Sequence, residues 1–249
     1  MSDAERLANA RAALLARIEG LVGKGPVGRF EEALTHASYA NETACTDNQR
    51  LEFLGDAVLG LCVSELLAAA YAAADEGKLT RMRSALVNAE ALASWARRVD
   101  LGACIALGRG AMLGTEREQS NVLADAAEAL VAAVYESHGL PGARALVEDV
   151  VGEGLVQAES LAAPDPKSAL QERVQASGMP APTYRVVEVR GLGADQTFEV
   201  EVVFDGRAVA RGTGRSKRTA ERAAAAMALE GVRSSVLPVH SILDKGSEA

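Results

Sequence analysis

The stretch NQRLEFLGDAVLGL, residues 48–61, decides the fold. Its apolar residues recur at intervals of three and four, which is typical of an amphipathic helix. Glu52 and Asp56 stand four residues apart, so on a helix they project only about 40° from each other. The stretch therefore predicts a core helix with two carboxylates on one face. Its apolar side is covered by Leu51, Leu54, Val58 and Leu59.

A second stretch, NVLADAAEALVAAVY (residues 121–135), places Asp125 and Glu128 three residues apart, again on one helical face. Burying a carboxylate is costly unless a positive group compensates. Residues 118–138 contain no Lys or Arg that could neutralise both acids. Four carboxylates converging from two helices would form an all-oxygen site, which favours Mg²⁺ or Mn²⁺ over zinc.

Two other interpretations of these acids stay open at this level. Acids on amphipathic helices are commonly solvated or paired with a cation. A di-iron bundle also uses carboxylates in a helical core, but it needs Glu-x-x-His on two helices. Neither His36 nor His138 fits that frame.

Helical periodicity also fills the rest of the chain up to about residue 161, interrupted by Gly and Pro. No stretch there alternates like a strand. We predict helices over residues 3–22, 29–37, 50–74, 78–86, 88–99, 118–138 and 141–160.

The pattern changes at AAPDP, residues 162–166, which predicts a short linker because a helix cannot continue through its prolines. The elements expected after it are a helix (168–178), three strands (183–190, 196–204 and 207–214) and a helix (216–232) capped by Ser216. We therefore expect a helical domain over residues 1–161, a second domain over 167–234 and a disordered tail over 235–249.

Charge is distributed unevenly along the chain, whose net charge is −8. Residues 1–163 hold 14 Lys and Arg against 23 Asp and Glu, a net charge of −9, and residues 164–249 hold 12 against 11, a net charge of +1. Residues 206–222 contain a single acid, Glu221. A local basic strip of this kind binds phosphate whatever the total charge. Its basic residues are Arg207, Arg211, Arg215, Lys217, Arg218 and Arg222.

The composition excludes several classes of protein. The 249 residues are 49% hydrophobic and 4% aromatic, so alanine, valine and leucine must fill the core. No uninterrupted apolar run reaches the roughly 20 residues that cross a bilayer, and the first residues lack a signal-peptide core. Three cysteines without a CxxC pair argue against a disulfide framework or a thiolate zinc site. We therefore expect a cytoplasmic protein with no membrane partner.

The motif NQRLEFLGDAVLG resembles the signature of the ribonuclease III family. Three further blocks resemble that family in the same order: EALTHASYANE (32–42), DEGKLTRMRSALVNAEALA (75–93) and LADAAEALVAAVY (123–135). The segment containing GRSKRTAERAAA (214–225) resembles a double-stranded-RNA-binding domain. The resemblance covers residues 5–233. It implies a multidomain chain, with an all-α endonuclease domain followed by an α+β (α-β-β-β-α) double-stranded-RNA-binding domain.

The resemblance implies a Mg²⁺-dependent endoribonuclease that hydrolyses phosphodiesters of double-stranded RNA to 5′-phosphate and 3′-hydroxyl ends, with Mn²⁺ as a substitute metal. It also implies a homodimer that processes rRNA precursors and mRNA hairpins. Glu76 matches an acid that helps to assemble the cleavage site. Phe53 matches an aromatic dimer contact, although ordinary core packing is an alternative role for it. The family's metal ligands match Glu52, Asp56, Asp125 and Glu128, of which Asp56 and Glu128 are catalytic.

Two positions depart from the family pattern. Gln49 stands where the family often has Glu; it lacks a charge but can still hydrogen bond to a ribose hydroxyl or a water, so we assign it to cleavage-site assembly. The loop GLGADQ (191–196) lacks the family's usual Gly-Pro-x-His, which weakens the case for its insertion into a minor groove. The RNA-binding residues implied by the resemblance are Ser168, Gln171, Glu172, Lys217 and Arg218.

Two alternative functions remain at this level. A non-catalytic RNA-binding regulator is favoured by Gln49 alone, and the four acids argue against it. A carboxylate-bundle metalloenzyme acting on small molecules leaves the basic strip and the second domain unexplained.

Overall fold

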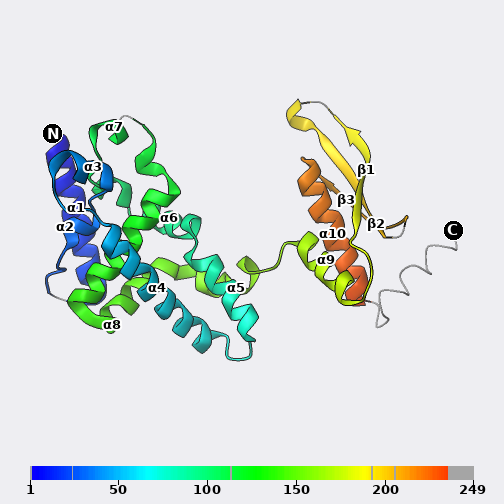
Figure 1. Ribbon diagram of the computed structural model, residues 1–249, viewed down its shortest axis with the longest axis horizontal. Coiled ribbons are helices and arrows are strands. Elements are labelled where there is room, and N and C mark those ends of the chain that lie inside the picture. The colour runs from blue at the N-terminus through cyan, green and yellow to red at the C-terminus, as the bar shows by residue number, and fades with distance from the viewer. Residues whose placement is uncertain (1, 24, 113, 192, 205, 235–249) are drawn as a thin grey trace. The chain divides into compact units, whose positions relative to one another are not determined.

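The computed structural model describes residues 2–23, 25–112, 114–191, 193–204 and 206–234. The chain packs as two compact units, residues 1–163 and 164–249 (Figure 1). Each unit has its own hydrophobic core. The predicted tail over 235–249 lies outside the described residues.

The first unit is a helical bundle assembled around one long helix, α8. Helices α1, α4, α5 and α6 all pack against α8 (Figure 1). Trp95 of α6 is fully buried, and its indole Nε1 donates to Asp149 of α8. The helices are α1 (Asp3–Val22), α2 (Phe30–Ala33), α3 (Ala37–Thr43), α4 (Gln49–Ala70), α5 (Glu76–Val87), α6 (Ala89–Arg98), α7 (Arg109–Met112) and α8 (Ser120–Leu161), with 3-10 turns η1 (Leu101–Cys104) and η2 (Glu116–Glu118).

The helix predicted over 29–37 is wrong after its first turn. Helix α2 ends at Ala33, and Thr35 forms an isolated bridge with Ala106. His36 then adopts an extended backbone and caps α3, because its side chain accepts a hydrogen bond from the Ser38 backbone N–H. A capping side chain satisfies an N–H that a continuous helix would have bonded internally, so it begins a new helix.

Helix α8 is interrupted at two glycines. Gly139 has a φ of 66° and precedes Pro141, which confirms the predicted break between 138 and 141. Gly152 has a φ of 40°, and the sequence did not predict that second interruption. Only glycine adopts such angles readily, but most glycines in helices do not mark a break, so periodicity alone could not identify this one.

Gly55 brings the backbones of α4 and α8 into direct contact. A Cβ atom placed on Gly55 would lie 1.9 Å from the carbonyl oxygen of Glu128. Only a residue without a side chain fits there. Since Gly55 lies between Glu52 and Asp56, and Glu128 follows Asp125 by less than one turn, the contact sets where the side chains of these two helices emerge.

By length and composition α4 is the one helix among the described residues that could cross a membrane, with 22 residues and a mean hydropathy of 1.7. The core helix of a globular domain passes the same test. Leu51, Leu59 and Leu67 of α4 are buried in the core of the first unit. Packing within this unit therefore accounts for the buried face of α4, while Phe53 and Leu61 on the same helix remain exposed.

The second unit has the predicted α-β-β-β-α order. Its three strands form an antiparallel sheet in the order β1-β2-β3, and helices α9 and α10 pack together with α10 against the sheet (Figure 1). Asp165 is the N-cap of α9, so this helix begins inside the predicted linker. Ser216 accepts a hydrogen bond from the Thr219 N–H, as predicted for the cap of α10. The elements are α9 (Pro166–Ala176), β1 (Thr183–Arg190), the 3-10 turn η3 (Gly193–Asp195), β2 (Thr197–Phe204), β3 (Arg207–Gly214) and α10 (Lys217–Ser234).

Two glycines bring α10 close to β3. A Cβ atom on Gly212 would lie 2.1 Å from the Ala224 backbone nitrogen, and one on Gly214 would lie 2.6 Å from the Ala220 nitrogen. Ala220 and Ala224 are fully buried. Small residues on both sides let the helix sit directly on the strand, which explains the alanine-rich sequence of α10.

Replacing Gly55 by Ala should destabilise the first unit, because the added methyl carbon would clash with the Glu128 carbonyl oxygen. We expect the free energy of unfolding to fall by about 1–3 kcal/mol or more. The matched control is Gly20→Ala on α1, where an added Cβ has no neighbour within 4 Å. This control should leave stability unchanged or raise it slightly. Denaturant unfolding measures both, and equal stability of the two variants would contradict the close contact.

Candidate active site

Four acids lie on both sides of the contact between α4 and α8. Glu52 and Asp56 come from α4, and Asp125 and Glu128 come from α8. Among the described residues, none of the four takes part in an ion pair or accepts a hydrogen bond on its carboxylate. The predicted set is therefore brought to one region without a side chain to neutralise it.

The electrostatics show that the four carboxylates interact. Burial, together with the charges of Asp56, Asp125 and Glu52, raises the pKa of Glu128 to about 7. Burial also raises the pKa of Glu52, with added contributions from Asp125, Asp47 and Asp56. Half-buried carboxylates that repel one another favour protonation or a bound cation.

His36 is the group that partly offsets this repulsion. Burial raises the pKa of Asp125, and the nearby His36 acts in the opposite direction. The His36 ring is held in place by its Nδ1, which lies 2.9 Å from the Ser38 hydroxyl. That hydroxyl in turn accepts a hydrogen bond from the Gly108 N–H at 3.0 Å. His36 and Ser38 therefore fix the loop that precedes α4 beside the acids.

The donor set fits a hard divalent cation in its chemistry. All four groups offer carboxylate oxygens, and the repulsion that raises the pKa of Glu128 would be relieved by a positive ion. As the side chains stand, no three His, Cys, Asp or Glu residues within the described ranges form a cluster tight enough to enclose a metal ion. The assignment of these acids as metal ligands stays a prediction.

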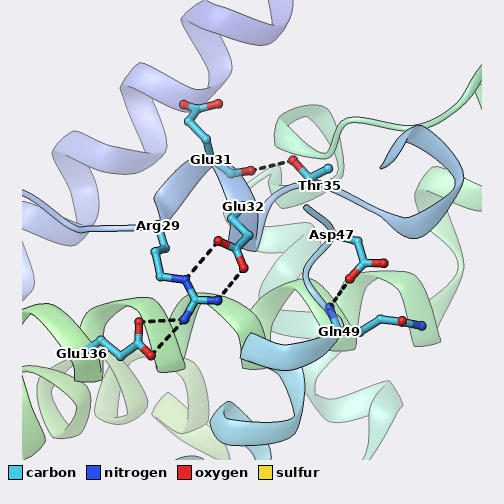
Figure 2. Close-up of polar contacts among 7 residues, drawn as sticks. All are labelled: Arg29, Glu31, Glu32, Thr35, Asp47, Gln49 and Glu136. Carbon is cyan, nitrogen blue, oxygen red and sulfur yellow. Dashed lines mark hydrogen bonds and ion pairs between the residues drawn. The ribbon is translucent and has the colours of Figure 1, made fainter. Parts of the chain in front are cut away.

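The start of α4 is anchored to α8 through the segment before it. Figure 2 shows the Arg29 guanidinium between the carboxylates of Glu32 and Glu136, the latter from α8, at 2.9 and 3.0 Å from Glu136. Further along this segment, the Thr35 carbonyl accepts a hydrogen bond from the Asn48 N–H at 2.9 Å. These contacts fix the end of α4 that carries Glu52.

Asp47 is a residue that the sequence analysis missed. Its carboxylate accepts a hydrogen bond from the Gln49 backbone N–H at 3.2 Å (Figure 2), and its charge contributes to the raised pKa of Glu52. The Gln49 side chain itself is exposed. An aspartate two residues before a helix is a common capping pattern, so no sequence signal distinguishes it from an ordinary cap.

Two further predicted residues lie on the surface of the same unit. The Glu76 carboxylate accepts a hydrogen bond from the Thr80 hydroxyl at 3.0 Å, and Glu76 is not among the charges that raise the pKa of Glu52 or Glu128. Phe53 is 83% exposed, so core packing is the wrong interpretation of this residue. Its role in a dimer contact and the role of Glu76 both stay predictions.

A groove in the second unit gathers most of the predicted RNA-binding residues. It has a volume of about 800 Å³ and lies between the starts of α9 and α10. Ser168 and Gln171 line it from α9, and Lys217 and Arg218 line it from α10. Glu172 is exposed on α9 but does not line the groove.

The metal-free protein should lose stability as the pH rises. Glu128 has a pKa of about 7 in the folded chain against an ordinary value of 4.5, so folding favours its protonated form. That contribution is complete below about pH 4.5 and is lost as the pH rises through 7. Glu128→Gln should flatten this profile and raise Tm at pH 8 in EDTA. The control Glu153→Gln, an exposed acid on α8, should keep the slope. An unchanged slope in Glu128→Gln would contradict the prediction.

Comparison with known proteins identifies both units. A family model described as Ribonuclease-III-like matches residues 29–153, and one described as double-stranded RNA binding motif matches residues 166–232. Ribonuclease 3 of Heliobacterium modesticaldum is 42% identical over 218 residues, which cover 86% of this chain and 92% of that protein. Ribonuclease 3 of Phenylobacterium zucineum is 43% identical over 220 residues, which cover 87% of this chain and 92% of that protein.

Solved structures agree for the first unit. A nuclease domain of ribonuclease III from Campylobacter jejuni, described for flexibility in a region involved in dimer formation, matches with a TM-score of 0.51 and 31% identity. The match covers 56% of this chain and 97% of that one. The chain therefore belongs to the ribonuclease III family of endoribonucleases, with a double-stranded RNA binding motif after its nuclease domain.

Proposed function

We propose that this endoribonuclease hydrolyses phosphodiesters of double-stranded RNA in a Mg²⁺-dependent reaction, leaving 5′-phosphate and 3′-hydroxyl ends. The observation that carries the proposal is the group of four mutually repelling, unneutralised carboxylates at the contact of α4 and α8. Four carboxylates repel the phosphate groups of RNA, so this site can bind RNA only together with a cation. The proposal extends to structured rRNA precursors and mRNA hairpins as substrates, in the cytoplasm.

Each helix contributes a distinct part of the site. Glu52 and Asp125 would serve as ligands that hold Mg²⁺, or Mn²⁺ in its place, and Asp56 and Glu128 would act both as ligands and as the catalytic acids. Bound there, the metal would lower the pKa of a water and offset charge on the phosphate. Without metal the pKa of Glu128 is raised the most of the four, to about 7, so a bound cation would relieve the largest electrostatic cost at this residue.

Gln49 and Glu76 are proposed to help assemble the cleavage site around the RNA strand. Gln49 is exposed at the first turn of α4, where its amide can donate to and accept from a ribose hydroxyl. Asp47, beside it, keeps a negative charge at this end of the helix.

The second unit is proposed to hold the duplex through the groove between α9 and α10. Lys217 and Arg218 begin α10, where backbone N–H groups and the helix dipole also favour phosphate. Ser168 and Gln171 offer hydrogen bonds to ribose hydroxyls, which distinguish RNA from DNA. Glu172 remains a weaker member of this proposed set because it lies outside the groove.

We also propose a homodimer in which the exposed apolar face of α4 meets its copy. Phe53 is 83% exposed and Leu61, two turns further along α4, is 50% exposed. An isologous contact between two such faces would bury both side chains. The related nuclease domain from Campylobacter jejuni has a region involved in dimer formation, which supports this proposal.

Glu128→Gln tests the catalytic role. We expect cleavage of a long RNA duplex in Mg²⁺ to fall at least about 100-fold, because the variant keeps the shape of the side chain and loses its charge. Duplex binding in EDTA, measured by fluorescence anisotropy, should remain. Glu153→Gln on the same helix should cleave like the parent protein. A parent protein that binds duplex RNA without cutting it in Mg²⁺ or Mn²⁺ would instead support an RNA-binding regulator.

Phe53→Ala tests the dimer. We expect the dimer dissociation constant to rise about 30-fold or more, as for a buried aromatic at an interface centre. The control is Val156→Ala, which removes an apolar side chain of equal exposure, 83%, from α8. Sedimentation velocity over a concentration series measures both. An unchanged dimer dissociation constant in Phe53→Ala would contradict this part of the proposal.

A further inference from the structure

Two ion pairs tie the start of α9 to the second turn of α10. Lys167 Nζ lies 2.6 Å from Glu221 Oε2, and Arg222 Nε lies 2.9 Å from Asp165 Oδ2. Adjacent residues of α10 thus reach two residues of α9 that are themselves linked, since the Asp165 carboxylate also accepts the Lys167 backbone N–H at 2.9 Å. These four residues, Asp165, Lys167, Glu221 and Arg222, are called the clasp below.

Of the two ion pairs, Lys167–Glu221 is the better shielded from solvent, since the Arg222 and Asp165 side chains are 51% and 37% exposed. The Glu221 side chain is only 14% exposed. The Lys167 ammonium also lies 4.4 Å from the centre of the Tyr184 ring of β1, a cation–π contact. Lys167 is therefore fixed by partners on two different elements. Removing Lys167 would leave the shielded Glu221 carboxylate without its ion-pair partner, so rearrangement of this pair is disfavoured.

The clasp lines the same groove as the proposed RNA contacts. Ser168 and Gln171 follow Lys167 within about one turn of α9, and Lys217 and Arg218 precede Glu221 by about one turn of α10. Because the clasp joins the two helices beside both sets, it helps to hold the proposed ribose contacts at a set distance from the proposed phosphate contacts.

We propose that the clasp is a positioning device by which this protein selects A-form RNA duplexes over B-form DNA. The inference rests on the proposed function of the groove. RNA and DNA duplexes differ in minor-groove width and depth, and therefore in the spacing between sugar edges and phosphates. A rigid spacing between α9 and α10 matches one form and not the other. A loose spacing would leave the cations of α10 able to bind either.

The proposal also assigns Arg222 a different role from its neighbours in the basic strip. Asp165 and Glu221 balance Arg222 and Lys167 within the clasp, so these two cations contribute little net attraction for phosphate. Phosphate binding in the groove then falls to Lys217 and Arg218, for which no ion pair is found among the described residues.

Glu221→Gln in the full chain tests the clasp. Binding to an RNA duplex and to a DNA duplex of the same sequence, each about 20 bp so that the domain's footprint fits, is measured in EDTA by fluorescence anisotropy. We expect the RNA-to-DNA preference to fall about three- to tenfold, the range of a coupled side-chain pair. Loss of a negative charge alone would instead strengthen binding to both duplexes and leave the RNA-to-DNA preference unchanged.

Matched variants separate position from charge and from folding. Glu188→Gln removes the same charge from β1, outside the groove, and should keep the parent preference. Tyr184→Phe keeps the aromatic ring beneath Lys167, so this variant should also keep the parent RNA-to-DNA preference. Lys167→Gln should lower the preference, and combining it with Glu221→Gln should add little, because both open one pair. Thermal unfolding checks that each variant is folded. If Glu221→Gln does not fold, Arg222→Gln, which opens the more exposed pair, is expected to lower the preference in the same way.

Two results would overturn the inference. One of them leaves the proposed function of the groove intact, and the other overturns that function too. If the parent binds RNA duplexes, Lys217→Ala weakens that binding, and Glu221→Gln keeps the parent preference, the clasp has no positioning role and the proposed groove survives. If the parent does not bind RNA duplexes, or Lys217→Ala leaves binding unchanged, the proposed function of the groove fails together with the clasp.

Discussion

The contact between the Gly55 backbone and the Glu128 carbonyl is the constraint on which the rest of the first unit depends. It permits an approach of α4 and α8 that any side chain would prevent, since a Cβ atom would lie 1.9 Å from that oxygen. Acids placed next to such a contact on each helix cannot move apart without separating the helices. The core that holds the helices together is thus also what forces four negative charges into one region.

That arrangement is costly for the protein alone, and the cost explains its chemistry. The pKa of Glu128 is raised to about 7 because burial and three neighbouring carboxylates act in the same direction. His36 acts in the opposite direction on Asp125 only. A fold that needed only stability would place a Lys or Arg here, as it does elsewhere: Arg29, for example, pairs with both Glu32 and Glu136 on the adjoining segment. Electrostatic repulsion among unpaired carboxylates is the pattern expected of a site that binds a cation.

Features of the structure that depend on a short stretch of sequence could be predicted, and features that depend on contacts between distant residues could not. The strands of the second unit are stretches of sequence that alternate or run apolar, and Ser216 caps its helix with its own side chain, so both were predictable from short stretches. Just after α2 ends, Thr35 pairs with Ala106, about seventy residues away, and no local pattern contains that pairing. The exposure of Phe53 depends on which face of α4 meets α8. The ion pairs of the clasp join residues more than fifty positions apart.

The two units differ in net charge, and their proposed electrostatic roles are complementary. The first holds a net charge of −9, which disfavours an RNA backbone at its four acids unless a cation intervenes. The second holds a net charge of +1 with its basic residues concentrated before and within the start of α10, so it attracts phosphate without needing a metal. Helix α8 ends at Leu161 and α9 begins at Pro166, so only four residues separate them. If the second unit holds a duplex as proposed, this short connection gives the duplex a high effective concentration for the first unit, whose acidic site alone would repel RNA.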